Sequence, residues 1–292
     1  MRWPILACGV ANAGHWPAAL NRGLLLVLAL GLLAAFAPFW ADDPLRIDLS
    51  ATLQDPSASH WLGTDALGRD LTARILHGGR ISLGIGVLTS LLSLAIGVPL
   101  GALAGFRGGW TDSAVSRLIE TVACVPSLLL AIALLAMSPP LLRGIPDVVR
   151  VALVLAFAGW IPVARYMRGE FLRLKSAVMV EAARASGASD LRIMVRHLLP
   201  AALAPVLVTA SFAAASAILV EAALSFLGLG VRPPQPTWGG LLSDAREQID
   251  QGWWLAVVPG LALYVAVLGF NLIGEGIRDL LDPRTRRRPV SR

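Results

Sequence analysis

The sequence has few of the side chains on which catalytic and metal-binding chemistry usually depends. Its two cysteines, Cys8 and Cys124, and its four scattered histidines lack the spacing of metal ligands or of a disulfide framework. Lys175 is the only lysine, and its neighbours do not form the Gly-Lys-Ser/Thr sequence of a phosphate loop. No serine has the Gly-x-Ser-x-Gly setting of a hydrolase. We therefore expect no catalytic residue, no metal site and no cofactor bound by this chain.

Charge is scarce as well. Only 15% of the residues are charged, 56% are hydrophobic and the mean hydropathy is +0.68. These values predict an all-α membrane protein, because a soluble domain of this length would carry more charge. A spanning helix needs roughly 18 to 20 apolar residues. Five charge-free windows come near or exceed that length: 23–40, 81–106, 121–137, 198–220 and 252–274. A sixth window, 151–164, is shorter and can span only if the charged side chains that flank it snorkel to the membrane interfaces. We expect six transmembrane helices.

The placement of arginine predicts the orientation. With the N-terminus inside, most of the 25 lysine and arginine residues fall on the cytoplasmic side, where positive charge is retained. Both termini are then cytoplasmic, and the net charge of +6 reflects topology and not nucleic-acid binding. The first apolar run is long for a signal peptide and lacks a clear cleavage site, so we expect a retained anchor. The predicted parts are a tail 1–22, a first helix 23–40, a periplasmic loop 41–79, a core 80–277 with a cytoplasmic coupling loop 169–199, and a tail 278–292.

The predicted periplasmic loop contains two polar triplets that are too regular for a simple tether. From the residues alone, a capped turn with a local Asp–Arg pair would explain them. A surface for a partner protein is the alternative. The six residues are Gly63, Thr64, Asp65, Gly68, Arg69 and Asp70.

Small residues and prolines mark packing positions within the predicted spans. Gly97, Gly101 and Gly105 recur every four residues, so they share one helix face and allow another helix to approach closely. Four prolines should each kink or start a span, because proline cannot donate a backbone hydrogen bond: Pro126, Pro162, Pro205 and Pro259.

Glu120 and Glu221 are the notable acidic residues near or inside the predicted spans. A carboxylate in this setting could serve a proton or ion relay, anchor at the membrane interface, or pair with a partner subunit. A secondary transporter would need paired charges at mid-membrane and usually an inverted repeat, and neither is clear here.

Residues 181–200 form a polar, alanine-rich stretch between two apolar segments. The run 178–186 lacks glycine and proline and predicts a short helix, which Gly187 can end in a left-handed conformation. Ser189 is a candidate N-cap for a second helix over 190–199, on which Arg192 and Arg196 lie one turn apart. Such a segment in a hydrophobic chain indicates that another protein docks on it.

These features resemble one family, the inner-membrane permease subunits of bacterial ATP-binding-cassette importers. The hallmark is a loop of the form Glu-Ala-Ala, three residues, Gly, nine residues, Ile, one residue, Leu-Pro. The matching residues are Glu181, Ala182, Ala183, Gly187, Leu199 and Pro200. His197 stands where the general pattern has isoleucine, which is similar to the peptide and nickel branch. Further matches are the two triplets, the run 225–230, the pair Trp238-Gly239 and the segments 270–274, 278–279 and 282–284.

The resemblance implies a multi-pass, non-catalytic subunit of the bacterial inner membrane. It implies a sister permease, two ATPase subunits that bind ATP and magnesium, and a periplasmic or lipid-anchored substrate-binding protein. The ATPase would dock on Glu181, Ala182, Ala183, Gly187, Arg192 and Arg196, although solvated arginines remain the alternative for the last two. The cargo implied is a dipeptide or oligopeptide, with nickel or a metal chelate as the alternative.

Overall fold

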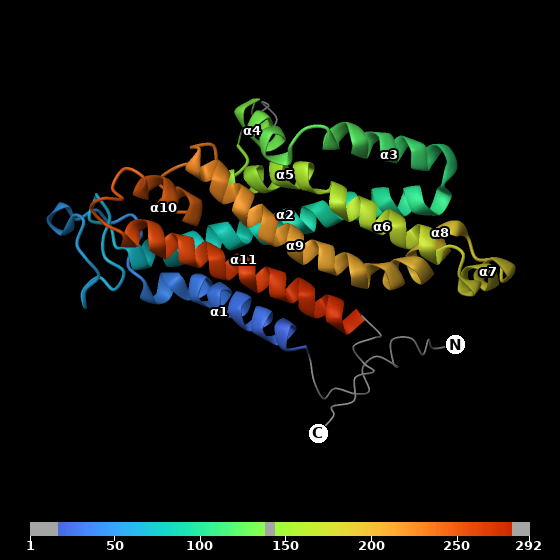
Figure 1. Cartoon of the computed structure of the whole chain (residues 1–292), viewed down its shortest axis with the longest axis horizontal. Coiled ribbons are helices and arrows are strands. Elements are labelled where there is room, and N and C mark those ends of the chain that lie inside the picture. Colours follow the sequence, from blue (N-terminus) through green and yellow to red (C-terminus); the bar gives the residue numbers. More distant parts are fainter. Residues whose placement is uncertain (1–16, 138–143, 282–292) are drawn as a thin grey trace, which may run out of the picture.

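The computed structural model describes residues 17–137 and 144–281 and is nearly all helical within them (Figure 1). The expectations for Cys8, for most of the tail 1–22 and for residues 282–292 lie outside the described residues. The elements are α1 (Ala18–Trp40), a short 3₁₀ turn (Leu49–Ala51), α2 (Leu71–Arg107), α3 (Gly109–Ala123), α4 (Ser127–Met137), α5 (Asp147–Gly159), α6 (Ile161–Leu174), α7 (Val178–Ala185), α8 (Asp190–Ile193), a π-helical turn (Met194–Leu198), α9 (Leu199–Phe226), α10 (Trp238–Ala245) and α11 (Trp254–Leu281).

The described helices give four to six candidate spans. Four uninterrupted stretches are long and apolar enough to cross a membrane, and two further pairs of helices qualify if each bent pair counts as one span. The continuous stretches run over Ala18–Phe39, Leu71–Arg107, Asp190–Phe226 and Trp254–Leu281. The all-α membrane fold is thereby confirmed.

The other two predicted spans are not single straight helices. In place of one helix over 121–137, α3 and α4 meet at 82°, and in place of one over 151–164, α5 and α6 meet at 47°. Proline explains both breaks. Pro126 directly precedes α4 and Pro162 lies in the first turn of α6, where its missing N–H is tolerated. Pro205 and Pro259 lie inside α9 and α11, which continue through them.

The long helices run lengthwise through the molecule, with α4 and α5 alongside them near the middle (Figure 1). Residues 41–70 and α10 lie at one end, whereas α7 and α8 lie at the opposite end. α2 runs through the bundle and packs against α1, α5, α6 and α9. The start of α1 adjoins the end of α11, since a Cβ atom at Gly276 would lie 2.5 Å from the backbone nitrogen of Leu20.

α2 begins at Leu71, inside the range 41–79 assigned to the loop. The Asp70 side chain accepts a hydrogen bond from the backbone N–H of Ala73 at 2.8 Å and so caps the helix. The charge-free window 81–106 begins ten residues after the start of α2, because Arg74 and Arg80 lie in the first turns of the helix.

The predicted glycine face on α2 packs against α6. A Cβ atom would lie 2.8 Å from the carbonyl oxygen of Trp160 if added at Gly97, and 2.6 Å from that of Arg168 if added at Gly105. These distances are shorter than real Cβ contacts, so the two backbones approach more closely than any residue with a side chain would allow. The prediction of close helix packing is confirmed.

Candidate functional site

The predicted helix, glycine turn and second helix are present at one end of the bundle. α7 ends at Ala185, and Gly187 takes a left-handed conformation with φ of +75°. Its backbone N–H donates to the carbonyl of Arg184 at 2.9 Å, and that of Ala188 donates to the carbonyl of Ala183 at 3.0 Å. This pair of bonds is a Schellman motif, which satisfies the last carbonyls of a helix and requires a left-handed residue.

The second helix does not end before Pro200. α8 covers only Asp190–Ile193, and a π-helical turn over Met194–Leu198 leads without interruption into α9. Proline lacks a backbone N–H, so a regular helix cannot pair the carbonyl four residues earlier, and a widened turn accommodates the gap. Ser189 occupies the N-cap position with extended backbone, but its side chain makes no capping bond.

The α7–α8 segment, residues 178–198, packs against the long helices through buried apolar residues. Val180, Ile193 and Leu198 are fully buried in one cluster with Phe106 of α2 and Phe171 of α6. The guanidinium of Arg184 also lies over the Phe106 ring, 5.9 Å from its centroid, a geometry that stabilises by cation–π attraction. The segment is therefore attached to the ends of α2 and α6 and is continuous with α9.

The opposite face of the α7–α8 segment is open. Of the predicted docking residues, Ala183 is half-buried and the rest are exposed: Glu181, Ala182, Gly187, Arg192 and Arg196. Three large apolar side chains that were not among the predicted docking residues are exposed in the same part of the chain: Val178, Leu191 and Val195 are 79%, 70% and 55% exposed. Leu191 and Val195 are four residues apart, and each directly precedes one of the two arginines. This spacing places both apolar side chains on one face of a helix and could have been recognised in the sequence. The surface thus combines apolar side chains with cationic ones and with the acidic Glu181.

The two polar triplets at the other end of the bundle form a buried ionic cluster. One carboxylate oxygen of Asp65 accepts from Arg69 Nε at 2.7 Å and from a terminal nitrogen of Arg74 at 2.5 Å. Arg74 reaches on to Asp244 of α10 at 3.1 Å. The side chains of Asp65 and Arg74 are only 6% and 5% exposed, whereas that of Asp244 is 52% exposed. The predicted local pair of Asp65 and Arg69 is therefore part of a larger cluster that includes Arg74 of α2 and Asp244 of α10.

The remaining triplet residues hold the turns of this loop. Gly63 and Gly68 have φ of +78° and +69°, and a Cβ atom at Gly68 would lie 1.7 Å from the carbonyl oxygen of Asp48. Thr64 is buried, and its carbonyl accepts from the Trp254 indole at 3.2 Å. Asp70 caps α2 and also contacts His60 Nδ1 at 2.9 Å. Each of the six triplet residues therefore makes a hydrogen bond or an ion pair with another residue of this chain, through its side chain or its backbone.

The structure separates the two acidic residues of the predicted spans. Glu120 is exposed on α3, whereas Glu221 is fully buried in α9. The hydroxyls of Ser225 and Ser82 donate to the Glu221 carboxylate at 2.7 and 3.3 Å. Ser82 also accepts from the backbone N–H of Trp238 at 3.1 Å. Glu221 is therefore the centre of a hydroxyl network that joins α2, α9 and the start of α10.

Comparison with solved structures supports the fold. The chain is similar to a chain of the MetNI methionine ABC transporter, with a TM-score of 0.57 and 20% identity, over 71% of this chain and 96% of that chain. A second crystal form of that transporter gives a TM-score of 0.54 and 17% identity over 72% and 97% of the two chains.

Sequence comparison identifies the family. The chain is 39% identical to a dipeptide transport system permease protein of Alkalihalophilus pseudofirmus, over 90% of this chain and 85% of the relative. It is 41% identical to a di/tripeptide permease of Pseudomonas aeruginosa (90% and 88% covered) and 38% identical to a glutathione permease of Pectobacterium atrosepticum (93% and 88% covered). Residues 97–287 match the model of binding-protein-dependent transport system inner membrane components. The chain belongs to this family of membrane permeases.

Proposed function

We propose that this chain is a permease subunit of an ATP-binding-cassette importer and forms half of the route by which peptides cross the inner membrane. The family supports the permease role, and the three relatives named above support the peptide cargo, because each is named for the transport of a dipeptide, a di- or tripeptide, or glutathione. The nickel alternative is not favoured, since none of these three names refers to a metal.

The α7–α8 segment is the docking site for an ATPase subunit. The observation that carries this assignment is its two-sided construction: one face is buried against α2 and α6, while Glu181, Gly187, Arg192 and Leu191 face outward. Exposed apolar side chains next to Arg192 and Arg196 suit a protein interface in which acidic groups of the partner face the two arginines. ATP and magnesium are bound by the ATPase subunits, and this chain contributes no catalytic group.

The connections of the segment provide a mechanical route into the membrane. When the ATPase dimer closes, the α7–α8 segment moves with it. Because the segment continues into α9 and is fastened to Phe106 of α2, this movement reorients the two helices that cross the centre of the bundle.

The opposite end of the bundle faces the periplasm, and both termini are cytoplasmic. A sister permease completes the route, and a substrate-binding protein delivers the peptide to the surface formed by α10 and residues 41–70. The ionic cluster of Asp65, Arg69 and Arg74 shapes this surface from within, because its side chains are largely buried.

A reconstituted complex tests the proposal. The chain is co-expressed with its chromosomal neighbours, purified, and placed in vesicles with the binding protein and a radiolabelled dipeptide. We expect ATP-dependent accumulation of the dipeptide and recovery of a second permease and ATPase subunits by native mass spectrometry. Accumulation of nickel in place of the dipeptide would overturn the cargo, and recovery of the chain without an ATPase partner would overturn the docking role.

A further inference from the structure

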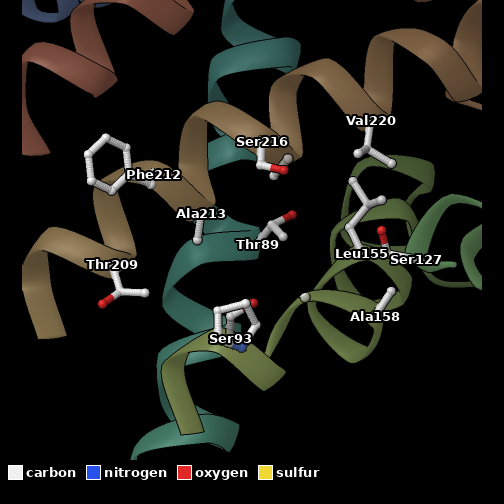
Figure 2. Close-up of a pocket in the computed structure, with 13 residues that line it drawn as sticks. Thr89, Ser93, Ser127, Leu155, Ala158, Thr209, Phe212, Ala213, Ser216 and Val220 are labelled. Carbon is white, nitrogen blue, oxygen red and sulfur yellow. The ribbon is translucent and has the colours of Figure 1, made fainter. Parts of the chain in front are cut away.

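A cavity of about 310 Å³ opens between α2, the α4–α5 region and α9 (Figure 2). Its lining combines apolar carbons with hydroxyl groups, and among the described residues none that lines it is ionisable. The hydroxyl-bearing residues are Thr89, Ser93, Ser127, Thr209 and Ser216. Ser216 and Ala213 of α9 lie across the cavity from the α5 residues Leu155 and Ala158 (Figure 2).

The cavity lies halfway along the spanning helices. Thr89 is the central residue of α2, with equal lengths of helix toward Leu71 and toward Arg107. On the other wall, Phe212 and Ala213 are the central residues of α9. A polar lining at this depth is costly unless the groups find partners, since hydrocarbon offers none.

Two of the hydroxyls lack such partners. Thr89 Oγ1 and Ser93 Oγ are buried without a hydrogen bond to the described part of the chain, and the two residues are 3% and 1% exposed. In a helix, serine and threonine usually bond to the carbonyl one turn earlier. Neither hydroxyl does so here, so both keep unused hydrogen-bonding capacity beside the cavity. Because both oxygens are buried, a side-chain rotation must expose them before water or a ligand can bind.

Both broken spans meet the same cavity. Ser127 is the first residue of α4, directly after the 82° bend, and Gly159 is the last residue of α5, directly before the 47° bend. Both residues line the cavity. Irregular backbone at membrane depth is tolerated where it is buried in protein or lines a water-filled space. The two breaks are therefore a second, independent indication of a hydrated site.

We infer that this cavity is a water-filled section of the translocation route and that its hydroxyls exchange hydrogen bonds with the backbone of the passing peptide. The inference rests on the proposed function for the identity of the cargo. Hydroxyls both donate and accept, which matches the amide N–H and C=O groups that all peptides share. Because no charged group from the described part of the chain lines the site, peptides with different side chains can pass, and the volume is in the range of small-ligand sites.

Cysteine accessibility tests the hydration. In a parent lacking both native thiols (Cys8→Ser, Cys124→Ser), Ser216→Cys is placed in the cavity wall. Leu91→Cys is the control, because Leu91 is 57% exposed on α2 but does not line the cavity. The assembled complex in vesicles is treated with a charged, water-soluble methanethiosulfonate. We expect Ser216→Cys to react at least about tenfold faster than Leu91→Cys, because the thiolate forms in water and not in lipid, and a saturating dipeptide to slow that reaction.

A volume test keeps the inference falsifiable if the thiol variants assemble poorly. Ala213→Phe fills the cavity, whereas Leu219→Phe adds the same ring to a half-exposed position of α9 outside the lining. We expect Ala213→Phe to reduce dipeptide uptake about tenfold relative to Leu219→Phe, equivalent to about 1.4 kcal/mol, with equal recovery of the complex. Equal uptake by the two variants would overturn the inference.

The outcomes separate this inference from the proposed function. If the thiol-free parent imports dipeptides but Ser216→Cys reacts no faster than Leu91→Cys, the cavity is not part of the route and the inference fails alone. If Ser216→Cys reacts rapidly but the parent imports no dipeptide, the peptide assignment fails while the hydrated cavity stands.

Discussion

The backbone of Gly101 in α2 lies directly against the carbonyl oxygen of Ala164 in α6. A Cβ atom at Gly101 would lie 2.3 Å from that oxygen and 2.9 Å from the Cβ atom of Met167. The obstacle is backbone and not the end of a flexible side chain, so it cannot move aside cheaply. This contact sets how closely α2 and α6 pack.

Gly101→Ala should therefore destabilise the bundle by about 1–3 kcal/mol, the usual effect of overpacking. Gly84→Ala is the matched control on the same helix, because a Cβ atom there meets nothing within 4 Å. Thermal unfolding of the purified chain in detergent should show a lower melting temperature for Gly101→Ala only. Equal melting temperatures would contradict the close packing of α2 and α6.

Asp65→Asn should be the most damaging change in the ionic cluster. It keeps the shape of the side chain but removes the charge that pairs with the buried Arg74, a loss of about 3–5 kcal/mol for a buried pair. Asp244→Asn should cost at most about 1 kcal/mol, because Asp244 is 52% exposed. The melting temperatures of the two variants measure the difference, and a larger effect from Asp244→Asn would show that the cluster depends on α10 instead.

At Gly187, conformation and bulk can be separated. Valine strongly disfavours φ of +75°, whereas asparagine of similar size tolerates it. A left-handed residue costs about 1–2 kcal/mol, so Gly187→Val should weaken ATPase binding about 5- to 30-fold, and Gly187→Asn less. Affinity of the purified ATPase for the two variants in nanodiscs provides the measurement. Equal weakening would mean that the ATPase surface excludes any side chain at this position.

Glu221→Gln distinguishes a structural role of Glu221, as the hydrogen-bonding anchor of the hydroxyl network, from a role in relaying protons. Glutamine keeps one oxygen that can accept from Ser225, and its amide nitrogen can donate to the Ser82 hydroxyl, so peptide uptake should stay close to that of the parent. Glu221→Ala should lower the melting temperature, since it leaves buried hydroxyls unpaired at about 1–3 kcal/mol. If glutamine abolishes uptake in a well-folded complex, the carboxyl group carries protons and the anchor role is wrong.

The spans were predictable from hydropathy, but their ends and bends were not. Hydropathy located α1, α9 and α11 because their apolar runs are long. It placed the start of α2 too late, because Arg74 and Arg80 lie in the first turns of the helix. Arg74 is accommodated there by Asp65, a partner that the fold brings near. The bends at Pro126 and Pro162 are local signals whose angles depend on packing, so the sequence could indicate the breaks but not the 82° and 47° turns.

The candidate site divides in the same way. The Gly187 turn follows from local chemistry, and the structure has it as expected. The attachment of Arg184 to Phe106 joins residues far apart in the chain, which no spacing rule reveals. The central cavity likewise depends on three distant segments, so its hydroxyls were invisible as a group in the sequence.

Because α2 is one continuous helix of 37 residues, it is a rod about 55 Å long. Asp70 and the ionic cluster hold one end, and Phe106 beneath Arg184 lies at the other. Tilting such a rod by about 5° around its Asp70 end would carry the Phe106 end through about 5 Å. Thr89, at the midpoint, would travel half as far. A sideways displacement of the α7–α8 segment would therefore move the cavity wall at Thr89 by about half as much.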